Sequence, residues 1–153
     1  MLQQLVLAML AFGAAPVSED AAPQCGVRYA TRFVSHFADL PEQIQMDILD
    51  DGKVADVGQP FEPYDSIVDP NLPSRRMVLA GQSGIKWFVW IDHGGFSRHP
   101  DVLGYSQLWE QDNTYSWYRS AELQGDPCIA INAFLDGVST HDLIRKGRRR
   151  TAQ

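Results

Sequence analysis

The sequence has little cysteine, little positive charge over most of its length and no long apolar run. Its two cysteines, Cys25 and Cys128, have neither the redox nor the metal-ligand spacing of paired-cysteine motifs. The longest apolar run, residues 5–12, is too short to cross a bilayer as a mature helix. Residues 81–85 (GQSGI) lack the final glycine of the Gly-x-Ser-x-Gly motif, and alternating βα units are also missing. These absences argue against a dithiol redox enzyme, a membrane-spanning mature chain and an α/β-hydrolase.

Positive charge is concentrated at the C-terminus. Five of the 13 Lys and Arg residues lie between 145 and 150, which leaves eight basic residues against 19 acidic ones before them. An acidic body of this kind argues against a specific nucleic-acid partner. Residues 141–153 are predicted to form a basic flexible tail, able at most to contact acidic surfaces weakly.

The first residues are typical of an export signal. The apolar run at 5–12 is followed by Gly13-Ala14-Ala15, small residues that suit a signal peptidase, although Met1–Gln4 carries no Lys or Arg. We therefore expect a signal peptide at 1–15 and an exported mature chain, periplasmic or secreted. In an oxidising compartment Cys25 and Cys128 should form a disulfide, worth about 4–5 kcal/mol for a loop of about a hundred residues. Two separate buried thiols are the alternative if the chain is not exported.

Residues 25–140 are predicted to form a single α+β domain. Apolar stretches separated by short turns indicate a four-stranded antiparallel meander, with strands at 76–80, 85–93, 102–110 and 114–120. A helix is expected at 40–50, capped by Asp39 and closed by Gly52. A second helix should run from Pro127, after an Asp126 cap, to Phe134.

Two segments are less regular. Residues 27–37 alternate in the manner of a strand, but Tyr29, Phe33 and Phe37 also have helical spacing; we favour the strand. The proline-rich segment 55–74 is expected to be a long ordered loop, held down by side chains of Phe61, Tyr64 and Ile67.

Aromatic residues are concentrated in the predicted meander. Nine of them, including all four Trp, lie between 87 and 118. In the strand at 85–93, the odd-numbered and the even-numbered positions are both apolar, so each face of the sheet presents apolar side chains that must be covered or exposed. Helices could cover both faces, the long loop could cover the second one, or that face could be an exposed aromatic binding surface; we favour burial. Trp90, Phe96 and Arg98 are the candidate binding residues if a surface is exposed.

The segment 92–101 (DHGGFSRHPD) is the best candidate for chemistry. Asp92, His93 and His99 are candidate catalytic residues, with Asp101 as an alternative acid, because imidazole suits acid–base work and metal ligation. However, strand alternation puts Asp92 and His93 on opposite faces. The spacing matches no zinc motif, so no metal or other cofactor is assigned. The simpler interpretation is a solvated hairpin loop whose polar side chains bind its own backbone.

Two main functions therefore remain open, besides that of a structural envelope component with no discrete ligand. The first is a non-catalytic exported binding protein, whose partner is an unknown protein or cell-envelope component. The alternative is a small hydrolase, with or without a metal, that uses the 92–101 loop. The absence of a catalytic signature favours the non-enzymatic interpretation.

Overall fold

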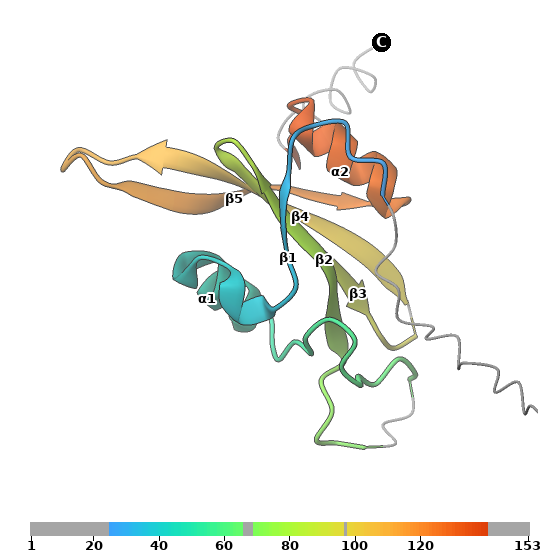
Figure 1. The fold of residues 1–153 in the computed structure, drawn as a ribbon. Coiled ribbons are helices and arrows are strands. Elements are labelled where there is room, and N and C mark those ends of the chain that lie inside the picture. Colours follow the sequence, from blue (N-terminus) through green and yellow to red (C-terminus); the bar gives the residue numbers. More distant parts are fainter. Residues whose placement is uncertain (1–24, 66–68, 97, 141–153) are drawn as a thin grey trace, which may run out of the picture.

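The computed structural model describes residues 25–65, 69–96 and 98–140. The predicted signal peptide, the basic tail and Ile67 lie outside these residues. The described part is an α+β domain built on one antiparallel sheet of five strands, in the order β1-β2-β3-β4-β5 (Figure 1). The strands are β1 Arg32–Val34, β2 Arg75–Ser83, β3 Lys86–His93, β4 His99–Trp109 and β5 Tyr115–Gln124.

The meander predicted from the turns is confirmed, with one strand more. β2 to β5 are consecutive antiparallel neighbours, and Gly84 and Asn113 adopt positive φ angles of 56° and 62° in two of their tight turns. The extra strand, β1, occupies part of the segment 27–37, so strand pairing prevails there over helix. A 3₁₀ helix, η1 Phe37–Asp39, follows it.

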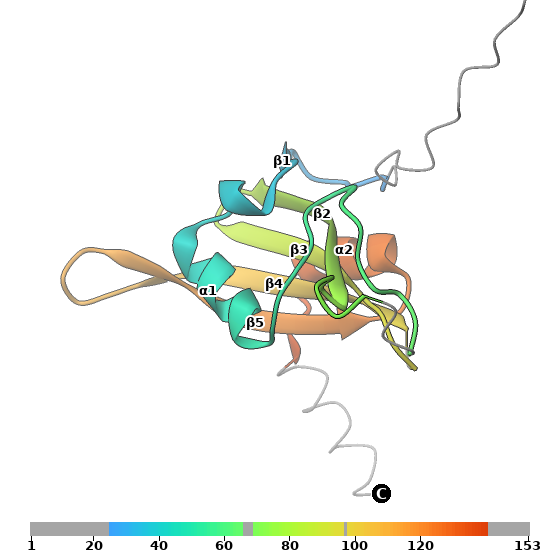
Figure 2. The ribbon, with the colours of Figure 1, turned by 90° about the horizontal axis from the view of Figure 1, so that it is seen from below.

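Helices cover both faces of the sheet, as Figure 2 shows. Helix α1 (Glu42–Asp50) packs Ile44 and Ile48 on the face that carries Trp87 and Val89. Helix α2 (Pro127–Leu135) covers the other face, in a cluster that includes Phe88, Val102, Ile131 and Phe134. Both faces of β3 are therefore buried, which explains its apolar residues at both parities.

Of the two helix caps predicted from the sequence, one is confirmed and one is wrong. The Asp126 side chain accepts a hydrogen bond from the Ile129 N–H, as expected of an N-cap. The predicted Asp39 cap is wrong, because Pro41 is extended (φ −53°, ψ 138°) and α1 begins only after it. Asp39 belongs instead to η1. Gly52 and Gly137 follow the helix ends with φ of 117° and 101°, conformations that favour glycine.

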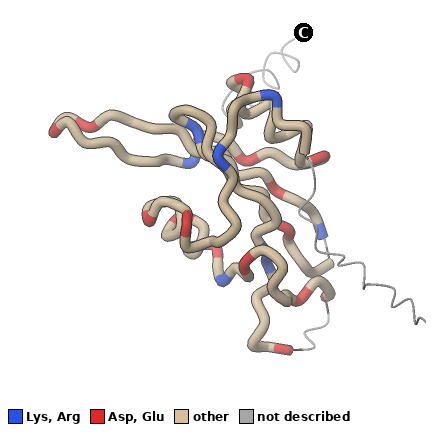
Figure 3. Tube along the Cα trace, in the orientation of Figure 1, with Lys and Arg blue, Asp and Glu red and all other residues tan. Residues whose placement is uncertain are grey.

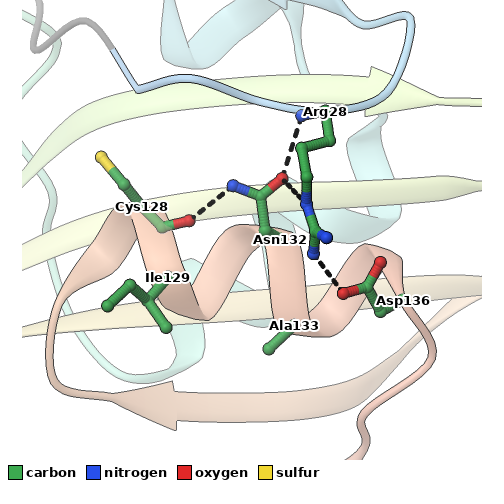
Figure 4. A pocket seen from close by; sticks show the side chains of 6 residues that line it. All are labelled: Arg28, Cys128, Ile129, Asn132, Ala133 and Asp136. Atoms are coloured by element: carbon green, nitrogen blue, oxygen red, sulfur yellow. Dashed lines mark hydrogen bonds and ion pairs between the residues drawn. The ribbon is translucent and has the colours of Figure 1, made fainter.

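The N-terminal segment is attached to α2. The sulfur atoms of Cys25 and Cys128 lie at disulfide distance, with their Cα atoms 5.2 Å apart. Arg28 extends this attachment, since its backbone N–H donates to Asn132 Oδ1 at 3.0 Å and its guanidinium pairs with Asp136 (Figure 4). Arg28, Cys128, Asn132 and Asp136 are among the residues that line an open pocket at the surface of α2.

Among its described residues, the long loop at 55–74 forms one isolated β-bridge with the sheet, between Ala55 and Arg76. Phe61 lies under the Arg76 guanidinium, 4.4 Å from ring centre to carbon, whereas Tyr64 is mostly exposed. The loop is therefore anchored by Phe61 and by backbone contacts rather than by Tyr64. In the described part of the chain, neither helix has the length or hydrophobicity to cross a bilayer.

Candidate functional site

The turn between β3 and β4 brings two histidines together. His93, the last residue of β3, lies directly opposite His99, the first residue of β4, in the antiparallel register. Directly opposed residues project to the same face of a sheet. Their imidazole rings stack almost parallel, with centroids 4.9 Å apart and an interplanar angle of 4°.

Asp101 completes a three-residue cluster. It lies two residues after His99 on β4, so its side chain projects from the same face. Asp101 Oδ2 is 3.1 Å from His93 Nε2 and 3.4 Å from His99 Nε2. One donor atom from each residue lies within 4.8 Å of the other two. Asp101 is 4% exposed, which rules out the solvated-loop interpretation for this carboxylate.

Asp92 does not join the cluster. Alternation places it on the α2 side of β3, opposite to His93, as the sequence indicated. There its carboxylate accepts a hydrogen bond from Trp90 Nε1 at 3.0 Å and lies 3.6 Å from the Arg76 guanidinium. Asp92 therefore has a local structural role, and Asp101 is the acid that accompanies the two histidines.

The backbone around Gly94 fixes the position of His93. A Cβ atom on Gly94 would lie 2.0 Å from the carbonyl oxygen of Glu62, so only glycine fits between the turn and the long loop. The Gly94 N–H donates to the Ser74 carbonyl at 2.7 Å, and the Gly95 N–H donates to the Pro63 carbonyl at 3.3 Å. The long loop thus holds the turn that carries the histidines.

The electrostatic surroundings of His93 favour its neutral form. Burial lowers the pKa of His93 below its ordinary value, against the opposing effect of the Asp101 carboxylate; His99 and Arg75 lower it further. Neutral imidazole is the form that accepts protons and ligates metals. The guanidinium of Arg75 is itself buried and donates to the Ile48 and Gly52 carbonyls at the end of α1.

The predicted binding residues differ in their exposure. Trp90 packs partly buried against the α2-side core, whereas Phe96 is 95% exposed in the β3–β4 turn and Arg98 is also exposed.

A second exposed region lies at the other end of the sheet. The hairpin of β4 and β5 extends beyond both helices (Figure 1, Figure 2). We call residues 108–118 the aromatic hairpin. Its exposed large side chains are Leu108, Trp109, Tyr115 and Tyr118, with exposed fractions of 49%, 68%, 50% and 46%. In the sequence these aromatics are part of the aromatic-rich meander, and the signal that could have singled them out is their position beside the 111–113 turn.

The aromatic rings of the hairpin contact one another edge to face. Trp109 and Tyr115 are cross-strand partners with ring centroids 5.9 Å apart at 72°. Tyr115 and Trp117 make a similar contact at 6.0 Å and 82°. Trp117 is partly buried and packs against the α1-side core, and its backbone N–H donates to Gln43 Oε1. The exposed rings of Trp109 and Tyr115 are thus connected through Trp117 to the packed core of the domain.

Comparisons with protein-family models, with curated proteins and with solved structures found no match for this chain.

Proposed function

We propose that this chain is an exported, non-catalytic binding domain of the cell envelope that contacts a protein partner through the aromatic hairpin. The observation that carries the proposal is the exposure of Trp109, Tyr115 and Tyr118 on a hairpin that projects beyond both helical layers. The proposal of export has separate support, from the apolar opening segment and from the Cys25–Cys128 pair at disulfide distance.

The exposure follows from the lengths of the elements. β4 has 11 residues and spans about 36 Å, whereas each nine-residue helix spans about 14 Å. Neither helix can therefore cover the whole sheet. The uncovered end carries aromatic rather than charged side chains, apart from acidic residues near the tip (Figure 3). Trp109 and Tyr115 are cross-strand partners and share one face of the hairpin, whereas Tyr118 lies on the other face. Large apolar side chains exposed together at one end of a domain favour an interaction site there.

The geometry favours a protein partner over a polysaccharide. The Trp109, Tyr115 and Trp117 rings meet at steep angles, so they do not form the flat platform on which sugar rings stack. β5 is also an edge strand of the sheet, which leaves part of its backbone able to pair with an extended segment. Tyr and Trp side chains with free polar tips are enriched at protein interfaces.

Site-specific photo-crosslinking in intact cells tests the proposal. A photoreactive residue placed at position 109 should give a discrete protein adduct, and Tyr115→Ser in the same chain should reduce its yield several-fold. Position 129 provides the matched control, because Ile129 is 71% exposed but lies on α2. Equal adducts from positions 109 and 129, or none from 109 and 118, would overturn the proposal.

The second candidate function is a small hydrolase at the β3–β4 turn. The convergence of His93, His99 and Asp101 favours it, since a buried carboxylate beside two imidazoles is an arrangement that can support acid–base chemistry. This function predicts a hydrolytic activity on ester or phosphoester substrates that His93→Ala abolishes while the protein stays folded. Activity that is indifferent to His93→Ala would remove this candidate.

A further inference from the structure

The ion-pair distances in the His93–His99–Asp101 cluster match those between ligands of one metal ion. Ligands about 2.1 Å from a tetrahedral zinc ion lie about 3.4 Å from each other. The two Nε2-to-Oδ2 distances are 3.1 and 3.4 Å, so Asp101 Oδ2 and either imidazole already stand at this spacing. The longest separation among the three donor atoms is within 4.8 Å, which a small ring rotation of a partly exposed histidine would shorten.

Asp101 supplies an independent indication of a ligand. Its side chain is 5% exposed, and its Oδ1 atom has no hydrogen-bond partner among the described residues. A buried carboxylate oxygen without a partner is costly, and almost all such atoms in proteins are paired. Both imidazoles lie near the other oxygen, Oδ2, so they do not compensate the cost of burying Oδ1. A cation bound between the three side chains would compensate the charge.

We propose that His93, His99 and Asp101 form a binding site for one divalent first-row transition-metal ion, such as Zn²⁺. Two imidazole nitrogens and one carboxylate oxygen suit such ions, whereas Mg²⁺ and Ca²⁺ prefer sites made of oxygen ligands. The site goes beyond the proposed partner binding, because it lies at the opposite end of β4 from the aromatic hairpin.

The fold prepares this site in advance. Asp101 lies near the start of β4, paired with Ile91 of β3 and Gln124 of β5, and the cross-strand register sets the two histidines opposite each other. Because a pre-positioned site loses little conformational entropy when the ion binds, this arrangement favours affinity. His93 and His99 are 27% and 39% exposed, so an ion can enter from solvent and retain a position for water or another ligand.

Metal titration of the untagged, metal-free full chain tests the site directly. Isothermal titration calorimetry and native mass spectrometry with Zn²⁺ and Co²⁺ should show one ion per chain, and Mg²⁺ should not bind at the same concentrations. His93→Ala and Asp101→Asn should each weaken Zn²⁺ binding at least tenfold. Zn²⁺ should also raise the melting temperature of the wild type and leave that of Asp101→Asn almost unchanged.

The control variant is His36→Ala. It removes a histidine that also lies beside a carboxylate, with His36 Nδ1 3.2 Å from Asp56 Oδ2, but that is not part of the proposed site. Its Zn²⁺ affinity should equal that of the wild type. If Asp101→Asn fails to fold, His99→Gln provides the same comparison with the buried carboxylate intact. Absence of saturable one-to-one binding by the wild type, or equal affinities of wild type and His93→Ala, would overturn the proposal. Both results would leave the crosslinking test of the aromatic hairpin unaffected.

Discussion

The Tyr105 hydroxyl donates a hydrogen bond of 2.6 Å to Asp47 Oδ2, and this contact joins the middle of β4 to helix α1. Tyr105 is 1% exposed. Arg119 of β5 donates to the same carboxylate oxygen at 2.8 Å and also binds Asp51 at 2.9 Å. The C-terminal half of α1 is thereby fixed on the sheet by a small polar network beside the apolar core.

Tyr105→Phe should therefore destabilise the domain. The substitution removes one hydrogen bond to a charged group while it keeps the ring, so we expect a loss of about 1–3 kcal/mol in the free energy of unfolding. Urea denaturation monitored by circular dichroism measures it. Tyr118→Phe is the matched control, because Tyr118 is 46% exposed and should change stability by less than about 0.5 kcal/mol. Equal effects of the two substitutions would contradict the role given to Tyr105.

The same tyrosine predicts a loss of stability at alkaline pH. Burial, followed by the hydrogen bond to Asp47, raises the pKa of Tyr105 well above its ordinary value of 10.0. The folded state thus keeps a proton that the unfolded state releases, so stability is full below about pH 10 and falls as the pH rises above it. Unfolding free energies measured across this range should decline more steeply for the wild type than for Tyr105→Phe. Parallel curves would contradict the prediction.

Loss of the cysteine pair should weaken the attachment of the N-terminal segment to α2. Replacing Cys25 and Cys128 together with Ser should reduce the free energy of unfolding by about 2–5 kcal/mol. The contacts of Arg28 with Asn132 and Asp136 remain and should keep the segment in place in the folded state. Wild type measured with and without reductant is the comparison: the reduced form should match the double variant. No difference between oxidised and reduced wild type would show that the pair adds nothing to stability.

Gly94→Ala should damage the fold near the histidines. The added methyl group would lie 2.0 Å from the Glu62 carbonyl oxygen, so the long loop must move, at a cost of about 1–3 kcal/mol. Gly26→Ala is the control, because a Cβ there meets nothing within 4 Å. Thermal unfolding compares the two, and histidine ring resonances in NMR spectra report whether His93 has moved. A wild-type melting temperature for Gly94→Ala would contradict the close packing.

Much of the sheet could be predicted from local patterns. The β3 residues Trp87 to Ile91 form an unbroken apolar run, and short turns on either side leave an antiparallel meander as the simplest connection. The two helices also followed from their apolar spacing and from the Asp126 cap. What the pattern left open was the second sheet face, because burial by a helix and exposure to a partner require the same apolar residues.

The candidate metal site could be predicted only in part, because it begins where the apolar pattern stops. The predicted strand began at Val102, whereas β4 already begins at His99. His99 and Asp101 are polar, so a method based on hydrophobic alternation assigns them to a loop. The burial of Asp101 depends on contacts between β3, β4 and β5, which no local window of the sequence contains. Alternation did place Asp92 on the opposite face from His93, but it could not place Asp101 beside the two histidines.

Because His93 pairs with His99 across the β3–β4 turn, the three-residue cluster depends on the register between these two strands. Successive side chains of a strand alternate between faces, so a one-residue shift of the β4 register would send His99 and Asp101 toward α2 and would also expose the buried face of the strand. The packed core therefore holds the register, and the turn itself must absorb a change in its length. Natural variation in the length of this turn is then compatible with the cluster as long as His93 stays opposite His99.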